Sequence, residues 1–400
     1  MAWRAANKVR KEMPGSADVS LPTLEPATGA YFAASRLLPE SPRCYIMPAP
    51  LANTLIYRPE LTGLRAVAVA IVLAQHWLQP AFPLGELGPS LFFVLSGYLV
   101  SGIIWEEAAY PGAAGRWGHR LGTFYLRRGL RILPAYYVAL LACALLPLAA
   151  VRAHPGWFLL PGANLFIYQG RGWPDGVGHF WTIAVEIQFY LLWPWLLGLT
   201  GRRPQWLLGL AVGAMLFRLL WAHYVRPDMV HLLLPVSFDV FALGALLRLG
   251  EGSPWLGRVA RGNYVAVAWA GWIVLQLLPA VSGWATAQAV GQASWLAVTE
   301  FLTVGWLLLP TRPGRQLGLG HPLLQWVGQR SYGMYLFHLP LLVFWQRLVY
   351  HEVPGAEGRA ILMGRWPVLL VLGPVLLLLS AALWRGLELP IDQLKKRFHY

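Results

Sequence analysis

Charged residues are scarce in this sequence, and cysteine is nearly absent. Only 12% of the 400 residues are charged, about half the share of a typical soluble chain, while 57% are hydrophobic. Long apolar stretches recur from residue 61 to residue 386. They exclude an ordinary soluble globular protein and predict an integral membrane protein. The two cysteines, Cys44 and Cys143, have no metal-ligand pattern around them, so we expect neither a disulfide nor a metal site.

The charge that is present is mostly positive, with a formal net charge of +14. In a soluble protein this excess would suggest binding to nucleic acid. Here the basic residues lie mainly in short loops between apolar stretches, where they indicate membrane orientation instead. We therefore expect membrane lipid, and not nucleic acid, as a partner. The N-terminus shows no short apolar region with a small-residue cleavage site, so we expect no cleaved signal peptide.

The apolar stretches predict an all-α, polytopic membrane protein with about ten transmembrane helices. The predicted spans lie near 61–80, 88–105, 132–151, 179–199, 204–224, 229–249, 264–281, 289–310, 330–350 and 365–386. They divide the chain into a flexible cytoplasmic N-terminal tail (1–56), a transmembrane domain (57–392) and a basic cytoplasmic tail (393–400). An alternative for the first tail is that the true start of the chain lies closer to Met47.

The distribution of arginine predicts which side of the membrane the termini occupy. Because ten is an even number, both termini lie on the same side. Placing them inside puts most arginines in inner loops, including Arg127, Arg128 and Arg131 before the third span. The outer loops then hold few basic residues, such as Arg152 and Arg171. The positive-inside rule therefore predicts cytoplasmic termini.

Several predicted spans contain polar residues, although a charge at the centre of a membrane helix costs about 2.5–3.5 kcal/mol. Arg65 and His76 lie eleven residues apart on the first span, about 16 Å along a helix. An arginine near the cytoplasmic face suits a phosphate-bearing donor, and a histidine deeper in the span suits proton transfer near neutral pH. The other such residues are His179, Glu186, Arg218, Asp239 and His338. Each also has a purely structural interpretation, as a hydrogen-bonded packing group or one half of an ion pair.

Six sequence blocks, in this order, resemble the acyltransferase-3 family of membrane O-acyltransferases. They are YRPELTGLR at 57–65 followed by His76, LFFVLSGYL at 91–99, FYLRRGLRILP at 124–134, HFWTIAVEIQFY at 179–190, SYGMYLFH at 331–338 and ELP at 388–390. The match covers about residues 57–392. Members of this family acylate bacterial surface glycans, nodulation factors and macrolides. One block alone would be weak, but six blocks in order make the resemblance specific.

Three positions depart from the pattern of the family. Ser90 stands where an aspartate is frequent, Ile187 where a second glutamate is frequent, and Thr182 where serine is usual. Thr182 keeps a hydroxyl, but no role of the frequent aspartate carries over to Ser90. Some members also have an esterase-like domain after the last span. This sequence ends at Tyr400, so the resemblance implies a stand-alone transferase.

The resemblance implies transfer of an acyl group, in the simplest case acetyl, from cytoplasmic acyl-CoA to a hydroxyl of a cell-surface glycan or its lipid-linked precursor. It also implies a multi-pass protein of the bacterial inner (cytoplasmic) membrane that uses acetyl-CoA, or another acyl-CoA, as donor and no metal. Two alternatives stay open: an O-acyltransferase for a small molecule such as a macrolide, and a non-catalytic membrane transporter. Against the transporter, no inverted repeat is evident in the sequence.

The resemblance further implies roles for individual residues. His76 is the expected catalytic base, and Glu186 is expected to orient His76 or to act as the base itself. Three arginines are expected to contact the phosphates of coenzyme A: Arg65, Arg128 and Arg131. The expected substrate-binding residues are Trp181, Tyr190, Asp239, Tyr335 and His338. Ordinary loop charge, ion pairing and aromatic anchoring at the membrane interface are the structural alternatives.

One serine in these blocks is not expected to react. Ser96 lacks the Gly-x-Ser-x-Gly context that exposes a nucleophilic serine at a sharp turn. The neighbouring Gly97 instead predicts a place where two membrane helices approach closely.

Overall fold

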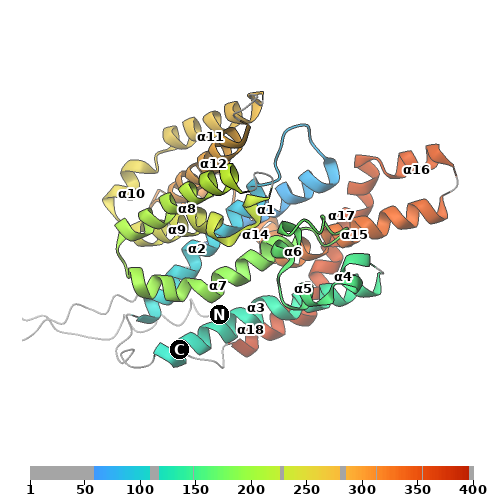
Figure 1. The fold of residues 1–400 in the computed structure, drawn as a ribbon, viewed down its shortest axis with the longest axis horizontal. Helices are drawn as coiled ribbons and strands as arrows, with labels where there is room; N and C mark the ends of the chain where they lie inside the picture. Colours follow the sequence, from blue (N-terminus) through green and yellow to red (C-terminus); the bar gives the residue numbers. More distant parts are fainter. Residues whose placement is uncertain are drawn as a thin grey trace, which may run out of the picture. The chain divides into compact units, whose positions relative to one another are not determined.

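A computed structural model describes residues 58–108, 117–146, 148–225, 229–279, 285–311, 313–353 and 355–395. The predicted N-terminal tail (1–56) lies outside these residues, as does most of the predicted C-terminal tail (393–400). In the described part of the chain all regular structure is helical, which confirms the all-α class (Figure 1).

Ten long helices, two of them continued by a π-helical turn (η1 after α1 and η3 after α17), make up most of the described part of the chain. They are α1 (Pro59–Leu73) with η1 (Ala74–Leu78), α2 (Leu87–Ala108), α3 (Trp117–Leu145), α7 (Phe180–Thr200), α8 (Pro204–Tyr224), α9 (Leu234–Gly250), α11 (Gly262–Leu277), α12 (Ala285–Leu307), α15 (Ser331–Glu352) and α17 (Arg365–Leu383). The shorter elements are α4 (Ala149–Ala153), α5 (Pro155–Leu159), α6 (Ala163–Tyr168), η2 (Val230–Leu232), α10 (Pro254–Val259), α13 (Pro313–Gln316), α14 (Pro322–Gln329), α16 (Ala356–Leu362), η3 (Trp384–Glu388) and α18 (Leu389–Lys395).

Six of the helical segments are long and apolar enough to cross a membrane, judged among the described residues. They are Pro59–Leu78, Leu87–Ala108, Trp117–Leu145, Phe180–Thr200, Pro204–Tyr224 and Arg365–Lys395. Each of the ten predicted spans overlaps one long helix, so the helices were placed well. Length and apolar character alone do not establish the count of ten; α11, for example, is apolar but has only 16 residues.

The third predicted span differs most from its helix. The prediction began at residue 132, whereas α3 already begins at Trp117 and has 29 residues. The basic segment before Ile132 continues the helix because arginine is a good helix former. A search for apolar runs misses this charged extension of the helix, although the extension positions Arg128 and Arg131.

Gly201 and Pro204 mark the end of α7 and the start of α8. The helix α7 ends at Thr200, and Gly201 follows with a φ of 61°, a conformation that suits glycine because it has no Cβ. Pro204 then occupies the first position of α8, where its missing N–H removes no helical hydrogen bond. A connection this short makes the two helices run in opposite directions.

The helix α2 forms the centre of the molecule. It packs against α1, α7, α9 and α12, and 72% of its most apolar window is buried, compared with 22% for Arg365–Lys395. A Cβ added at Gly97 of α2 would lie 2.2 Å from the carbonyl oxygen of Phe241, and one added at Gly244 of α9 would lie 2.2 Å from that of Val94. The two backbones therefore touch, as the sequence predicts for Gly97.

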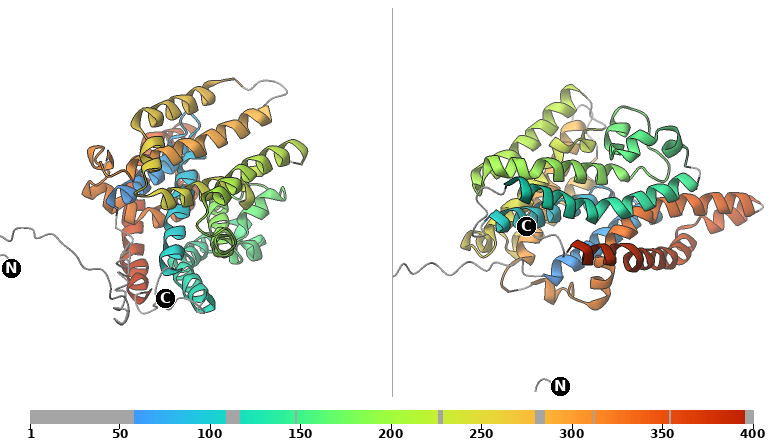
Figure 2. Two further views of the ribbon diagram at one scale, coloured as in Figure 1. Left: turned by 90° about the vertical axis from the view of Figure 1, so that its left-hand side faces the viewer. Right: turned by 90° about the horizontal axis from the view of Figure 1, so that it is seen from below.

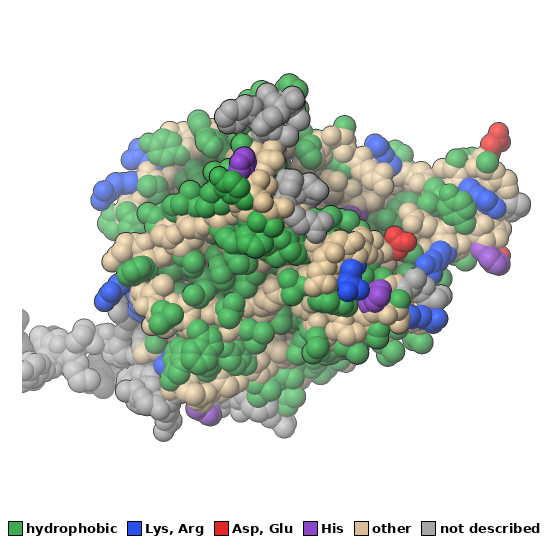
Figure 3. Space-filling view, in the orientation of Figure 1, with side chains coloured by type: hydrophobic (Ala, Val, Ile, Leu, Met, Phe, Trp, Pro, Cys, Tyr) green, Lys and Arg blue, Asp and Glu red, His purple; other side chains and the backbone are tan. Residues whose placement is uncertain are grey.

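The outward-facing helices expose large apolar side chains. Leu370 and Leu378 of α17 are 70% and 72% exposed, and Leu199 of α7 is 85% exposed. Most of the face seen in Figure 3 is apolar, with lysine and arginine near its margins. Soluble monomers rarely expose apolar surface on this scale, so this surface fits a bilayer. The helices α15 and α17 pack against each other and extend together toward α16 (Figure 2).

Candidate functional site

Three histidines from distant parts of the chain meet in the structure. His76 lies in η1, His179 directly precedes α7, and His338 lies in α15. The ring centroids of His76 and His338 are 4.9 Å apart, and those of His179 and His338 are 4.6 Å apart. We call this group the histidine cluster. It joins two predicted site residues, His76 and His338, with His179, which the sequence marked only as polar at the start of a span.

Hydrogen bonds to backbone carbonyls fix the tautomers of all three neutral rings. His76 Nδ1 lies 2.9 Å from the Val72 carbonyl oxygen, and His338 Nδ1 lies 2.6 Å from that of Tyr335. His179 Nε2 lies 3.1 Å from the Leu336 carbonyl oxygen. A carbonyl only accepts, so each of these nitrogens carries the proton and donates. The opposite ring nitrogens therefore keep their lone pairs.

Two of those lone pairs are buried without a donor. His179 Nδ1 and His338 Nε2 have no hydrogen-bond partner among the described residues. A buried acceptor left unsatisfied costs about 1–3 kcal/mol, so a hydroxyl group placed beside them would be stabilised. Within the described segments, no group of three or more His, Cys, Asp or Glu side chains is arranged to hold a metal.

Local structure holds the histidine cluster in place. The π-helical turn of η1 carries His76, and the next residue, Trp77, donates from Nε1 to the His338 carbonyl oxygen at 3.2 Å. The Tyr335 hydroxyl shares a hydrogen bond of 2.6 Å with Thr182 Oγ1. The hydroxyl that Thr182 keeps in place of serine therefore links the first turn of α7 to the cluster. Tyr335, a predicted substrate-binding residue, is buried here.

The three predicted donor-binding arginines lie in a second group, toward the start of α15. Arg65 Nε lies 3.4 Å from Ser331 Oγ, and its guanidinium lies 5.6 Å from the centre of the Phe92 ring. The Arg128 guanidinium lies 5.6 Å from the centre of the Tyr190 ring. Arg131 lies 3.8 Å from Asp392 of α18. We call Arg65, Arg128 and Arg131 the arginine cluster.

Carboxylates accompany the arginine cluster. Glu186 Oε1 accepts hydrogen bonds from Ser96 Oγ at 2.9 Å and from the Tyr190 hydroxyl at 2.5 Å. Among the charges that act most on Arg65 are those of Arg131, Glu186 and Glu388. Glu388 lies in the π-helical turn η3, and both its carboxylate oxygens are buried without a hydrogen bond in the described part of the chain.

The structure thus places Glu186 with the arginines and Tyr190. No contact joins its carboxylate to His76 across the described residues. Glu186 forms no ion pair with Arg65 or Arg218 among the described residues, and Arg218 pairs with Asp239 instead.

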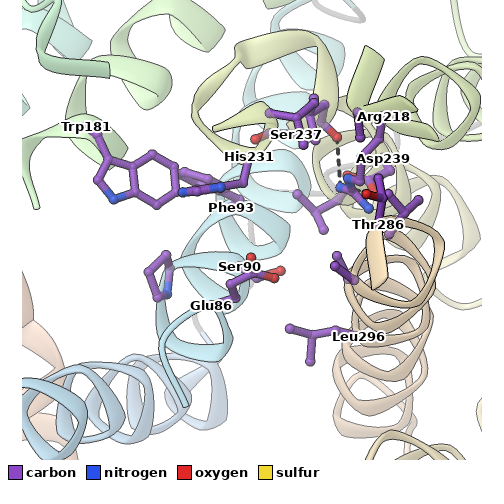
Figure 4. Close-up of a pocket in the computed structure, with 18 residues that line it drawn as sticks. Glu86, Ser90, Phe93, Trp181, Arg218, His231, Ser237, Asp239, Thr286 and Leu296 are labelled. Carbon is purple, nitrogen blue, oxygen red and sulfur yellow. Dashed lines mark hydrogen bonds and ion pairs between the residues drawn. The ribbon is translucent and has the colours of Figure 1, made fainter. Parts of the chain in front are cut away.

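A cavity of about 510 Å³ lies between α2, α7, α8, α9 and α12 (Figure 4). The polar and aromatic side chains that line it are Glu86, Ser90, Phe93, Trp181, Arg218, His231, Ser237, Asp239 and Thr286. Two of them, Trp181 and Asp239, were predicted to bind substrate. At one wall Arg218 Nη2 donates to Asp239 Oδ2 at 2.7 Å, and Asp239 is fully buried. We call this space the α2–α12 cavity.

Sequence reasoning missed Glu300, a fully buried carboxylate of α12. It accepts a hydrogen bond of 2.5 Å from Ser90 Oγ, and its other oxygen has no partner among the described residues. The signal was available, because an acid in the middle of a predicted span at 289–310 needs a reason as much as Arg65 does. Ser90, which replaces a frequent aspartate, thus serves as the donor to a carboxylate from another helix.

A third polar group lies at the end of the molecule where α1 begins and α2 ends. Arg58 pairs with Glu251 at 2.6 Å, the Tyr98 hydroxyl donates to Glu251 at 2.6 Å, and Arg248 contacts both Glu251 and Glu106. Burial alone would raise the pKa of the Glu251 carboxyl, but the hydrogen bond and the two arginine charges outweigh burial and lower it. This network ties three helix ends together, away from the histidine cluster.

Comparison with known proteins gives a consistent family. A family profile described as an acyltransferase domain matches residues 58–385. Over 325 residues the chain is 27% identical to the peptidoglycan O-acetyltransferase OatA of Listeria monocytogenes, a match covering 72% of this chain and 49% of that protein. Over 327 residues it is 24% identical to a candidate O-acetyltransferase of Staphylococcus aureus, covering 72% and 51%. Over 321 residues it is 25% identical to a candidate peptidoglycan O-acetyltransferase of Bacillus subtilis, YrhL, covering 72% and 49%.

The chain therefore spans about half the length of the curated relatives it matches. No solved structure matches it.

Proposed function

Because this chain belongs to the acyltransferase-3 family, we propose that it is a membrane O-acetyltransferase that moves acetyl from acetyl-CoA to a hydroxyl of a cell-wall glycan. The names of its relatives, peptidoglycan O-acetyltransferases among them, support a glycan acceptor. The observation that carries the proposal is the histidine cluster, in which His76 keeps a free Nε2 lone pair beside two buried, unsatisfied imidazole nitrogens.

In this proposal His76 is the general base. Its Nε2 takes the proton of the acceptor hydroxyl while the hydroxyl oxygen forms a bond to the carbonyl carbon of the thioester. The carbon–sulfur bond breaks, and the proton passes from His76 to the departing thiolate. The hydrogen bond from His76 Nδ1 to the Val72 carbonyl holds the ring in the required tautomer. His338 and Tyr335 position the ring and the acceptor.

The arginine cluster is the proposed site for the phosphates of the donor. Guanidinium groups bind phosphate oxygens through paired hydrogen bonds. Arg65 lies seven residues into the first helix, near the start of α15, whereas His76 lies at the end of that helix. The reach of a long donor molecule therefore fits phosphates at Arg65 and a thioester near His76. Glu186 holds Ser96 and Tyr190 and balances the arginine charge.

The proposal includes the membrane arrangement. Ten helices cross the bacterial inner membrane and both termini lie in the cytoplasm, which puts the basic start of α3 inside. Acetyl-CoA then approaches from the cytoplasm and the glycan from the other face. Membrane lipid surrounds the exposed leucines of α7 and α17.

Purified protein in detergent tests the proposal directly. We expect it to form a base-labile acetyl ester on soluble peptidoglycan fragments from radiolabelled acetyl-CoA, detected by mass spectrometry and scintillation counting. Detergent micelles have no compartments, so a transporter without chemistry would give no ester. Ester formation on a macrolide, and none on glycan, would favour the small-molecule alternative.

Replacing Arg65 with alanine should raise the KM for acetyl-CoA and leave the KM for the glycan unchanged. A hydrogen bond to a charged group contributes about 1.5–3 kcal/mol, which corresponds to a rise of roughly 10- to 100-fold. The matched control is Arg359→Ala on α16, outside the arginine cluster. An unchanged KM for acetyl-CoA in Arg65→Ala would remove this residue from the donor site.

A further inference from the structure

We propose that the α2–α12 cavity is the acceptor subsite and that it holds one neutral amino-sugar unit of a glycan. This inference rests on the proposed function, which leaves open where the acceptor binds. Its volume of about 510 Å³ falls within the range of small-molecule sites.

The cavity opens at the end of the molecule where the helix carrying His76 finishes. Its lining comes from the last two turns of α8, from η2, and from the N-terminal halves of α2, α7, α9 and α12. His76 lies at the end of η1, and only the loop 79–86 separates η1 from α2. Gln75 Oε1 accepts a hydrogen bond of 2.9 Å from the Leu84 backbone, which ties this loop back beside His76. Glu86, at the other end of the loop, lines the cavity.

One layer of side chains on α2 and α7 separates the cavity from the histidine cluster. Trp181 lines the cavity. The adjacent Thr182 forms a hydrogen bond with Tyr335, which lies beside the histidine cluster. On α2, Phe93 lines the cavity, and the adjacent Phe92 lies 6.2 Å from Tyr335 between ring centroids. A glycan held in the cavity would thus lie one layer of side chains away from the histidine cluster.

The lining combines an aromatic wall with uncommitted polar groups, which is the combination that a sugar requires. The rings of Trp181 and His231 meet edge to face, with their centroids 5.6 Å apart (Figure 4). Apolar C–H faces of a sugar pack on such rings. Glu86 and Ser237 form no side-chain hydrogen bond with another described residue, so both remain available to sugar hydroxyl and amide groups.

The charge of the cavity lining differs from that of the proposed donor site. Arg218 donates hydrogen bonds to Asp239, to the Val236 carbonyl oxygen and to Ser294. Asp239 is neutralised by that ion pair, and the exposed Glu86 carboxylate leaves the lining net negative. Phosphates would be repelled here and attracted to the arginine cluster. A neutral sugar unit meets no such penalty.

Protection of an introduced thiol tests the subsite without using catalysis. In a Cys44→Ser background the remaining Cys143 is buried, and Ala289→Cys places an exposed thiol on α12 at the cavity. We expect chitotetraose, a neutral N-acetylglucosamine oligomer, to suppress alkylation of this cysteine in detergent, whereas coenzyme A does not. The matched control is Gly291→Cys, which is exposed on the same helix but does not line the cavity. Its alkylation should not respond to chitotetraose.

Kinetics give the second measurement. Trp181→Ala should raise the KM for glycan fragments about tenfold, through lost stacking, and leave the KM for acetyl-CoA unchanged. Trp206→Ala, at an exposed position on α8, should behave like the wild type. Glycan transfer by the wild type without protection of Ala289→Cys would overturn the subsite and leave the proposed function standing. Protection of the cysteine without any ester formation would support the subsite and contradict the proposed function.

Discussion

Replacing His76 with alanine should lower the rate of acetyl transfer by about 10²- to 10⁴-fold, the range that general-base catalysis contributes. Alanine removes the Nε2 lone pair that takes the hydroxyl proton, and the ring centroid of the neighbouring His338 lies 4.9 Å from that of His76. The measurement is the initial rate of ester formation at saturating acetyl-CoA and glycan. Binding of acetyl-CoA should persist, because the arginine cluster does not contact His76.

The control for this variant is His119→Ala. His119 is an exposed histidine near the start of α3, and its loss should not change the rate. A His76→Ala protein that binds acetyl-CoA and still transfers at the wild-type rate would make His76 a packing residue. Glu186 would then become the next candidate base, although its contacts with Ser96 and Tyr190 place it among the arginines.

Removing one partner of the Arg218–Asp239 ion pair should destabilise the protein by about 3–5 kcal/mol. Asp239 is fully buried and Arg218 is nearly so, so Asp239→Ala leaves a positive charge without its partner inside the bundle. The measurement is equilibrium unfolding in mixed detergent with increasing SDS, followed by tryptophan fluorescence. The 21 tryptophans provide the signal.

A double variant separates the pair from its individual charges. Arg218→Leu combined with Asp239→Leu removes both charges, so it should cost less than either single change. Glu352→Ala, which breaks an exposed pair with His351, should shift stability by less than about 0.5 kcal/mol. If the costs of the two single changes simply add in the double variant, the two side chains do not stabilise each other.

The sequence predicted the positions of the helices better than it predicted which helices pack against each other. Apolar runs located ten helices because a bilayer requires long apolar segments, and the same logic marked His76, His338 and Asp239 as unusual. It did not indicate which of these residues meet. His76 and His338 are close because α1 packs against α15, a contact that no local pattern encodes. Asp239 pairs with Arg218 at the wall of the α2–α12 cavity.

Three features of the site depend on contacts between helices, which the sequence of a single span does not reveal. The α2–α12 cavity is built from five helices, so no motif describes it. The role of Glu186 was inferred from a shared motif, but the position of its carboxylate depends on Ser96 of α2 and Tyr190 one turn along α7. The unpaired nitrogens of His179 and His338 also emerge only when the carbonyl partners of each ring are known.

The glycine contact between α2 and α9 has a consequence for the energy balance of the cell. A protein with a polar cavity at one end and arginines toward the other offers ions a route, and each charge that crosses dissipates about 2.3 kcal/mol per 100 mV of membrane voltage. At Gly97 and Gly244 the two backbones touch, so no file of water molecules fits between these helices. The contact therefore closes the space between α2 and α9 to water and ions at this level of the helices.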